Sequence, residues 1–352
     1  MMPAMGGPAQ ALLRNPVSTT GLPRRDTGTA AVLDPVQQKV LELQRDAGNA
    51  AVTQLVRPDG TTNASVPEDA ASIEQAKGLF LQGAAVYDMG QYAKAYDFFT
   101  RASELAPRAN LQFSRAQALR RMGAHRDEAI ALYKEYLATG DGKRDADATR
   151  ALKELDTPAS TGDLELDAAA AKTIFDKGAA LYEQRDFAHA YDEFTRAGEL
   201  ADRPGIIFSR AQALRRLGGH REEAMDLYRA YLATKHGVRD KDASDAINEL
   251  STPESTGDLD KDVATSRSIF DKGARLYDAG DFAHAYDEFS RAGELTDRAG
   301  ILFSRAQALK RLGGRREEAM ALYQAYLDKG QGTRQADATT ALEELRTKGV
   351  AK

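Results

Sequence analysis

The sequence predicts an all-α protein made of three tandem copies of one five-helix unit, preceded by a tail of 67 residues. The first observation is an ungapped repeat with a period of 95 residues, seen at Phe80, Phe175 and Phe270. The second is a helical spacing of apolar residues inside each unit, with no window of sustained strand alternation. The third is that all 25 aromatic residues lie at or after Phe80, so the tail has none. An exact long period indicates a duplicated structural module.

The tail, residues 1–67, is expected to be mostly disordered. It holds seven of the eleven prolines and no aromatic residue. Such a segment cannot bury enough apolar surface to offset the entropy lost on ordering. We expect one helix within it, over about 35–57, because Asp34 can cap a helix and Pro35 suits its first turn.

The period divides the rest of the chain into modules at 68–162, 163–257 and 258–352. The segments DTPASTGD (156–163) and STPESTGD (251–258) lie at the two internal boundaries. Pro, Ser, Thr and Gly dominate these segments, which is typical of linkers. We therefore expect the three modules to be joined by short linkers.

The five helices of a module can be followed by their apolar faces in the second copy. A turn at Arg185–Asp186 separates the first two helices, and the third ends at Gly218–Gly219. The faces carry Phe175, Gly178, Leu181 and Tyr182; then Phe187, Ala190, Tyr191, Phe194 and Ala197; then Ile207, Ala211 and Leu214; then Ala224, Leu227, Tyr228 and Tyr231; then Ala243, Ala246, Ile247 and Leu250.

Five is an odd number of helices, whereas a continuous solenoid alternates inner and outer helices. The fifth helix is therefore expected to cap its own module, with the polar side formed by Asp242, Asp245, Asn248 and Glu249 facing water. This predicts three capped modules in a row. The alternative is one unbroken superhelix.

The first two helices of each unit resemble a tetratricopeptide repeat, a helical hairpin with small residues where its helices cross. The first copy carries this pattern at Gly83, Val86, Tyr87, Gly90, Tyr92, Ala95, Phe99, Ala102 and Pro107. The second copy departs from it at Arg185, where the family has a turn glycine. The next two helices match more weakly, through Ala116, Leu119, Gly123, Ala129 and Tyr133. The resemblance implies a binding scaffold rather than a particular activity.

A second resemblance lies in the tail, at LQRDAGNAAV. It is similar to a short motif found near the N-terminus of bacterial proteins linked to extracellular contractile injection systems. The matching residues are Leu43, Gln44, Arg45, Gly48, Asn49 and Val52. The resemblance implies recruitment to such an apparatus. The alternative is an ordinary amphipathic helix with Val40, Leu43 and Ala47 on one side.

Composition and motifs argue against several classes of function. The chain has no cysteine, which excludes thiol catalysis and cysteine-based metal sites. Its net charge of −5 argues against a nucleic-acid partner, and no apolar run suits membrane insertion. The five histidines form no metal-binding signature, and His189 and His284 are expected on a solvated helix face beside acidic residues. We expect no catalytic residue, metal or cofactor, and a cytoplasmic protein or one exported inside an injection particle.

The third helix of each module is the candidate binding surface, because the first helix of each tetratricopeptide hairpin lines a groove in that family. Its candidate groove residues are Gln117, Arg120 and Arg121; Gln212, Arg215 and Arg216; and Gln307, Lys310 and Arg311. A glutamine beside two cations suits an acidic peptide. The alternative is a basic stripe paired with neighbouring acids. Arg115, Arg210 and Arg305 are expected at a helix–helix seam, paired with an acid of the preceding hairpin.

These observations predict a non-enzymatic scaffold that binds a protein or peptide. The tail motif further suggests a cargo or accessory protein that is recruited to, or loaded into, a bacterial contractile injection system. One alternative is a structural or assembly adaptor retained in the producing cell. Another is the regulatory subunit of an enzyme.

Overall fold

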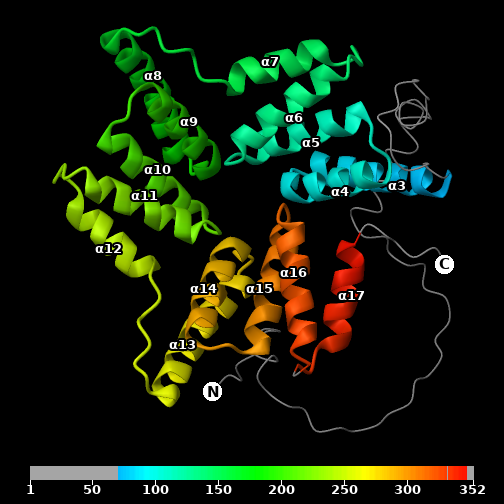
Figure 1. The fold of residues 1–352 in the computed structure, drawn as a ribbon, viewed down its shortest axis with the longest axis vertical. Coiled ribbons are helices and arrows are strands. Elements are labelled where there is room, and N and C mark those ends of the chain that lie inside the picture. The colour runs from blue at the N-terminus through cyan, green and yellow to red at the C-terminus, as the bar shows by residue number, and fades with distance from the viewer. Residues whose placement is uncertain (1–69, 331, 347–352) are drawn as a thin grey trace, which may run out of the picture.

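The computed structural model describes residues 70–330 and 332–346, and every regular element in these ranges is an α-helix (Figure 1). The all-α prediction is therefore confirmed. The expected tail helix over 35–57 lies outside the described residues. The helices are α3 (Ala70–Asp88), α4 (Tyr92–Leu105), α5 (Ala109–Met122), α6 (Arg126–Ala138) and α7 (Asp145–Leu155); α8 (Leu164–Glu183), α9 (Phe187–Leu200), α10 (Pro204–Leu217), α11 (Arg221–Ala233) and α12 (Asp240–Leu250); and α13 (Leu259–Asp278), α14 (Phe282–Leu295), α15 (Ala299–Leu312), α16 (Arg316–Asp328) and α17 (Gln335–Leu345).

Local chemistry explains where these helices begin and end. Asp163 caps α8 by accepting from the backbone N–H groups of Glu165 and Leu166. The third helix of the second module starts at Pro204 and stops at Gly218, whose φ of 74° is in the left-handed region. Arg185, the departure from the family's turn glycine, takes the same conformation with φ 65°. The hairpin therefore keeps its turn geometry even though a non-glycine residue disfavours it.

The first hairpin of each module is held by a close approach between a glycine and a phenylalanine ring. A Cβ at Gly178 would lie 2.8 Å from the ring of Phe194, which is closer than side chains approach one another. Gly83 faces Phe99 and Gly273 faces Phe289 in the same way. Larger residues at these positions would separate the paired helices. The glycine thus explains the tight pairing of α8 with α9.

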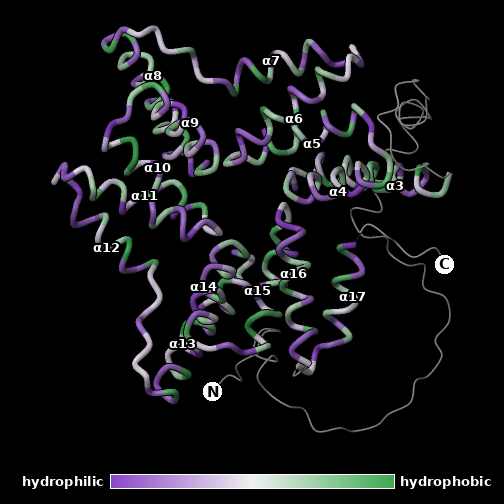
Figure 2. Tube along the Cα trace, in the orientation of Figure 1, coloured by the Kyte–Doolittle hydropathy of each residue, from purple (hydrophilic) through white to green (hydrophobic). Residues whose placement is uncertain are grey.

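The fifth helix covers the apolar face left open by the third and fourth helices. In the first module Ala148 and Ala151 of α7 pack against Phe113, Tyr133 and Tyr136. The opposite side of the equivalent helix α12 is polar and exposed, as expected for a cap. Figure 2 shows the resulting alternation of hydrophobic and hydrophilic positions along the helices.

The linkers are ordered extended segments that run along the outside of the molecule (Figure 1). Asp167 orders the first linker, 156–163, by accepting hydrogen bonds from Ser160 Oγ at 2.6 Å and from the N–H and Oγ1 of Thr161 at 2.8 Å. These hydrogen bonds lower the pKa of Asp167. Asp262 holds the second linker through Ser255 and Thr256 in the same manner.

The three modules form a closed ring, which differs from both expected arrangements. The turn after α5 contacts α9, and the turn after α10 contacts α14. The turn after α15 returns to the first module, where Gly313 and Gly314 lie against Ala93 and Lys94 of α4. Figure 1 shows the modules around a common centre. Each fifth helix ends its module, so the turn between the third and fourth helices can dock on the next module. Three such contacts with the same geometry close the ring.

Candidate functional site

Three equivalent seams join the modules, and a buried arginine organises each one. Arg126 donates from Nε to the carbonyl of Leu155 at 2.8 Å. Leu155 is the last residue of α7, the fifth helix of the same module. The guanidinium of Arg126 also binds Glu199 of the next module. Arg221 and Glu294 repeat this pair at the second seam, and Arg316 and Glu104 repeat it at the third. The repetition of the pair at the third seam shows that the ring closes with the same geometry.

An aspartate forms the second contact of each seam; Asp192 and Asp287 are buried, and Asp97 is partly buried. The backbone N–H groups of Ala124, Gly219 and Gly314 donate to Asp192, Asp287 and Asp97 at 3.0, 2.8 and 2.9 Å. Burial raises the pKa of Asp97 and Asp287 to about 6, although these hydrogen bonds favour the ionised form. The same effect raises the pKa of Asp192 to about 7. The seams therefore contain carboxyl groups that titrate near neutral pH.

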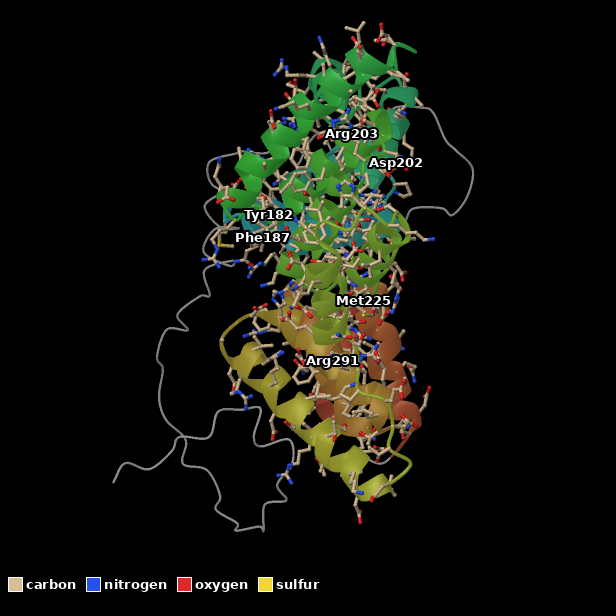
Figure 3. The ribbon with its side chains drawn as sticks, turned by 90° about the vertical axis from the view of Figure 1, so that its left-hand side faces the viewer. Tyr182, Phe187, Asp202, Arg203, Met225 and Arg291 are labelled. Atoms are coloured by element: carbon tan, nitrogen blue, oxygen red, sulfur yellow. The ribbon has the colours of Figure 1, made fainter. Side chains whose placement is uncertain are left out.

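A third contact ties the end of each fifth helix to the following module. Arg196 donates to the carbonyl of Asp156 at 2.8 Å, Arg291 to that of Ser251 at 2.8 Å, and Arg101 to that of Arg346 at 3.3 Å. Figure 3 labels Arg291 below Met225, whose sulfur accepts from the hydroxyl of the same Ser251. Backbone carbonyls carry no sequence signal, so these contacts could not be predicted.

Two of the seams contain a bridging histidine. His189 binds Asp186 through Nδ1 at 2.8 Å and the carbonyl of Arg120 through Nε2 at 3.1 Å. Burial alone would lower the pKa of His189, but these hydrogen bonds raise it. His284 makes the same bridge between Asp281 and the carbonyl of Arg215. The expected acidic neighbours are present as Asp186 and Asp281, but the two side chains are only partly exposed and also reach across a seam. Lys94 stands at the equivalent position of the closing seam.

His125, His220 and Arg315 meet at the centre of the ring. The two imidazole rings have centroids 6.4 Å apart, and Arg315 Nη1 donates to the carbonyl of Gly219 at 2.9 Å. Burial lowers the pKa of His125, and the positive groups His220 and Arg315 act in the same direction. No group of side chains among residues 70–330 and 332–346 could hold a metal ion. These three residues mark the axis about which the modules repeat.

The predicted groove residues divide into two sets. Arg120, Arg215 and Lys310 form ion pairs with Glu154, Glu249 and Glu344 of the fifth helices. This pairing follows the alternative of a basic stripe neutralised by neighbouring acids. Gln117 accepts a hydrogen bond of 3.3 Å from the hydroxyl of Tyr87. Gln212 and Gln307 occupy the equivalent, partly buried positions.

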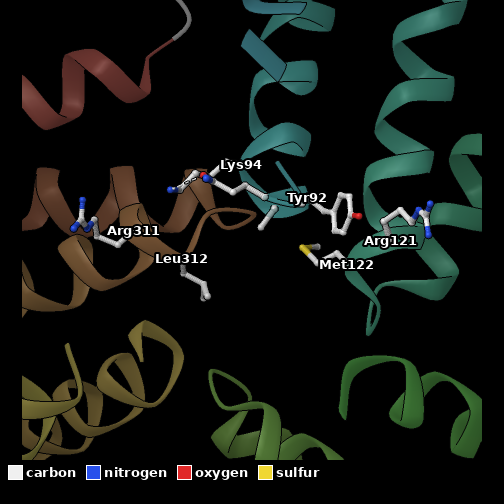
Figure 4. Close-up of a pocket in the computed structure, with 9 residues that line it drawn as sticks. Tyr92, Lys94, Arg121, Met122, Arg311 and Leu312 are labelled. Atoms are coloured by element: carbon white, nitrogen blue, oxygen red, sulfur yellow. Dashed lines mark hydrogen bonds between the residues drawn. The ribbon is translucent and has the colours of Figure 1, made fainter. Parts of the chain in front are cut away.

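Arg121, Arg216 and Arg311 form the second set, and all three are exposed. The guanidinium of Arg311 lies over the ring of Phe282, 5.4 Å from its centroid. A hydrogen bond with Tyr87 raises the pKa of Arg121. Arg121 and Arg311 line opposite ends of a pocket of about 370 Å³ at the closing seam, with Lys94, Met122 and Leu312 between them (Figure 4).

The expected partner of Arg115, Arg210 and Arg305 is wrong. Arg115 lies over the ring of Tyr96 at 5.5 Å and donates to Thr100 Oγ1 at 3.1 Å. Arg210 and Arg305 lie over Tyr191 and Tyr286. The acids of this region, Glu128, Glu223 and Glu318, instead accept from the tyrosine hydroxyls. An aromatic ring presents a negative face to a cation, which explains why these arginines contact tyrosine rings instead of carboxylates.

Sequence reasoning missed a groove between the first and third helices of a module. In the third module it has a volume of about 360 Å³ and is lined by Arg267, Arg298 and Arg334 together with Val263, Phe270 and Ile301. Its lining residues include no carboxylate. Arg334 is positioned over Phe303 at 4.6 Å, and Arg144 and Arg239 lie over Phe113 and Phe208 at 4.8 Å. The recurrence of these arginines every 95 residues was the sequence signal that could have identified this groove.

The chain is similar to solved structures of helical-repeat proteins at low sequence identity. No protein-family model and no curated protein sequence matches the chain. Among solved structures, the TPR domain of P58(IPK) is similar at 14% identity and a TM-score of 0.24, covering 88% of this chain and 96% of its own. Yeast Tom70 is similar at 15% identity and a TM-score of 0.21, covering 88% of this chain and 64% of its own. None of the helices described here is both long and apolar enough to span a bilayer. The described residues form repeated helical hairpins arranged in a ring.

Proposed function

We propose that the protein is a non-enzymatic scaffold that binds an acidic protein or peptide in the grooves of its modules. The observation that supports this function is the groove of the third module, where three arginines surround an apolar floor. Its lining residues include no carboxylate, and of the three arginines Arg334 pairs with Asp337 at 2.6 Å, just outside the groove. An extended segment could place carboxylates on the arginines and apolar side chains on Val263 and Ile301. Lys77, Arg108 and Arg144, and Lys172, Arg203 and Arg239, provide equivalent cations in the other modules.

The tail adds a proposal about where the scaffold acts. Leu43, Gln44, Arg45, Gly48, Asn49 and Val52 would recruit it to a bacterial contractile injection system as a cargo or accessory protein. The competing functions are an assembly adaptor that stays in the producing cell and the regulatory subunit of an enzyme. Purified particles would contain a cargo and lack an adaptor, and deletion of residues 34–57 should remove a cargo from them.

Groove binding is tested with a labelled acidic peptide that also carries apolar residues. The double variant Arg267→Glu with Arg298→Glu should weaken binding, because it reverses two of the three charges in the third groove. Arg229→Glu provides the control, since this exposed arginine pairs with Asp226 on α11. Equal affinity of the groove variant, the control and the unmodified protein would contradict the proposed function.

A further inference from the structure

We propose that Arg121, Arg216 and Arg311 form a threefold docking face for a homotrimeric protein whose subunits each present an acidic group. The proposal rests on the scaffold function above, and it adds the symmetry of the partner. A monomeric acidic peptide would bind one of these arginines, whereas a trimer centred on the ring axis would bind all three together.

The seams show that the arginines are related by rotation. The same arginine–glutamate pair and the same amide–aspartate bond occur at all three seams. Residues related by rotation about one axis lie at the same height along it and face the same way. Each arginine precedes a residue of the central group by four positions, as Arg121 precedes His125. Arg121 and Arg311 also line one pocket from two sides of the closing seam.

The identity of these arginines is not explained by recent duplication alone, because other exposed positions have diverged. Lys134 corresponds to Arg229 and Gln324, and Arg150 corresponds to Asp245 and Thr340; all six residues are exposed. Arginine at the equivalent exposed position of all three modules therefore needs an explanation other than duplication.

Other exposed residues that are identical in all three copies have such a reason within the chain. Glu104, Glu199 and Glu294 form the seam ion pairs, and Glu154, Glu249 and Glu344 hold the fifth helices. Asp147, Asp242 and Asp337 lie in the first turn of a helix, where a carboxylate is favourable. In contrast, Arg121, Arg216 and Arg311 have no carboxylate partner among the described residues, and the contacts of Arg121 with Tyr87 and of Arg311 with Tyr277 and Phe282 leave their charge uncompensated. A carboxylate for them is therefore expected on another molecule.

The side chains are suited to this role. A guanidinium binds a carboxylate through two parallel hydrogen bonds. When the guanidinium is already stacked on an aromatic ring, it loses less conformational entropy on binding. Arg311 is stacked on Phe282 in this way. Single exposed contacts of this kind are weak, but three made by one rigid partner reinforce one another through effective concentration. Threefold symmetry in the partner converts three weak sites into one specific face.

The test uses a stable trimeric coiled coil that carries a glutamate-rich segment on a flexible Gly/Ser linker at one end of each chain. The same segment as a free monomer is the reference. The full-length protein should bind the trimer about 10²–10⁴-fold more tightly than the monomer, at one ring per trimer. The triple variant Arg121→Glu, Arg216→Glu, Arg311→Glu should reduce this advantage to nearly none. Each single variant should cost much less, and Arg229→Glu should have no effect.

The outcomes separate this proposal from the proposed function. If trimer and monomer bind equally, and both respond to Arg267→Glu with Arg298→Glu, the threefold face is wrong and the groove scaffold stands. If neither probe binds, both proposals are contradicted. Circular dichroism of the triple variant should match that of the unmodified protein, and an affinity for the trimer that survives in a folded triple variant also overturns the proposal.

Discussion

Gly178 and Ala190 show how single residues set the distance between paired helices. A Cβ at Gly178 would meet the ring of Phe194, and Ala190 of α9 is completely buried. Small residues are required on both sides of this crossing because the helix backbones lie close together. The sequence signalled both positions through their spacing, and the close packing confirms the hairpin assignment.

Replacing Ala190 with leucine should therefore destabilise the second module. The larger side chain has no space at a position with 0% exposure, and overpacking of this kind costs about 1–3 kcal/mol. Urea denaturation followed by circular dichroism measures the change in the free energy of unfolding. Ala230→Leu, on the exposed side of α11, is the matched control and should have little effect. A neutral Ala190→Leu would mean that the helices are paired differently.

The seam aspartates predict how stability depends on pH. Burial raises the pKa of Asp192 from 3.8 to about 7, so the folded protein holds this proton more tightly than the unfolded chain does. Its contribution to stability is fully present below about pH 4 and is lost as pH rises through about 7. The raised pKa values of Asp97 and Asp287 act in the same direction.

Asp192→Asn should reduce the loss of stability between pH 5 and pH 8. The amide keeps a carbonyl oxygen that can accept from Ala124, but it does not ionise. The measurement is the melting temperature of both proteins across this range. Asp226→Asn, at an exposed position on α11, is the control. The same slope in Asp192→Asn and in the unmodified protein would exclude an ionisable role for Asp192.

At the scale of elements, sequence reasoning predicted what local spacing determines. Apolar periodicity located the five helices of a module, and glycines marked their ends. The seams were missed because their residues are far apart in the chain, as Arg126 and Glu199 are, and because many of their donors and acceptors are backbone groups. The pairing of Arg120 with Glu154 was foreseen only as an alternative to peptide binding.

The linkers provide a prediction at this scale. Asp167 holds the segment 156–163 through Ser160 and Thr161, so Asp167→Ala should expose that segment to protease. Limited proteolysis with mass spectrometry measures the rate of cleavage at each linker. The second linker, 251–258, is an internal control because Asp262 still holds it. Equal cleavage of both linkers in the variant would show that Asp167 does not order the first.

At the scale of the whole molecule, closure depends on one seam that no described linker spans. The seam between the third and first modules contains the same buried ion pair, Arg316 with Glu104, as the seams between covalently joined modules. A linker keeps two modules at high effective concentration after their contacts break. The third and first modules are held together at the closing seam by noncovalent contacts, and the described chain connects them only through the second module.

Glu104→Gln should therefore open the ring more readily than Glu199→Gln, although both remove the same kind of charge. Removing one partner of a buried pair can cost about 3–5 kcal/mol, and partial exposure of the glutamates should reduce this cost. Small-angle X-ray scattering should show a larger radius of gyration for Glu104→Gln with unchanged helical content. Equal dimensions of the two variants would mean that other contacts suffice to keep the ring closed.

The equivalence of the seams also bears on the order of the modules along the chain. Arg101 binds the carbonyl of Arg346, so the end of α17 meets the first module just as Asp156 meets the second. A circular permutant that begins at Asp163 and joins 346 to 70 with a second copy of DTPASTGD should build the same ring, detectable by its unchanged scattering profile. Which module is translated first would then be an accident of gene order, and new termini at either linker would leave the axis and all three seams in place.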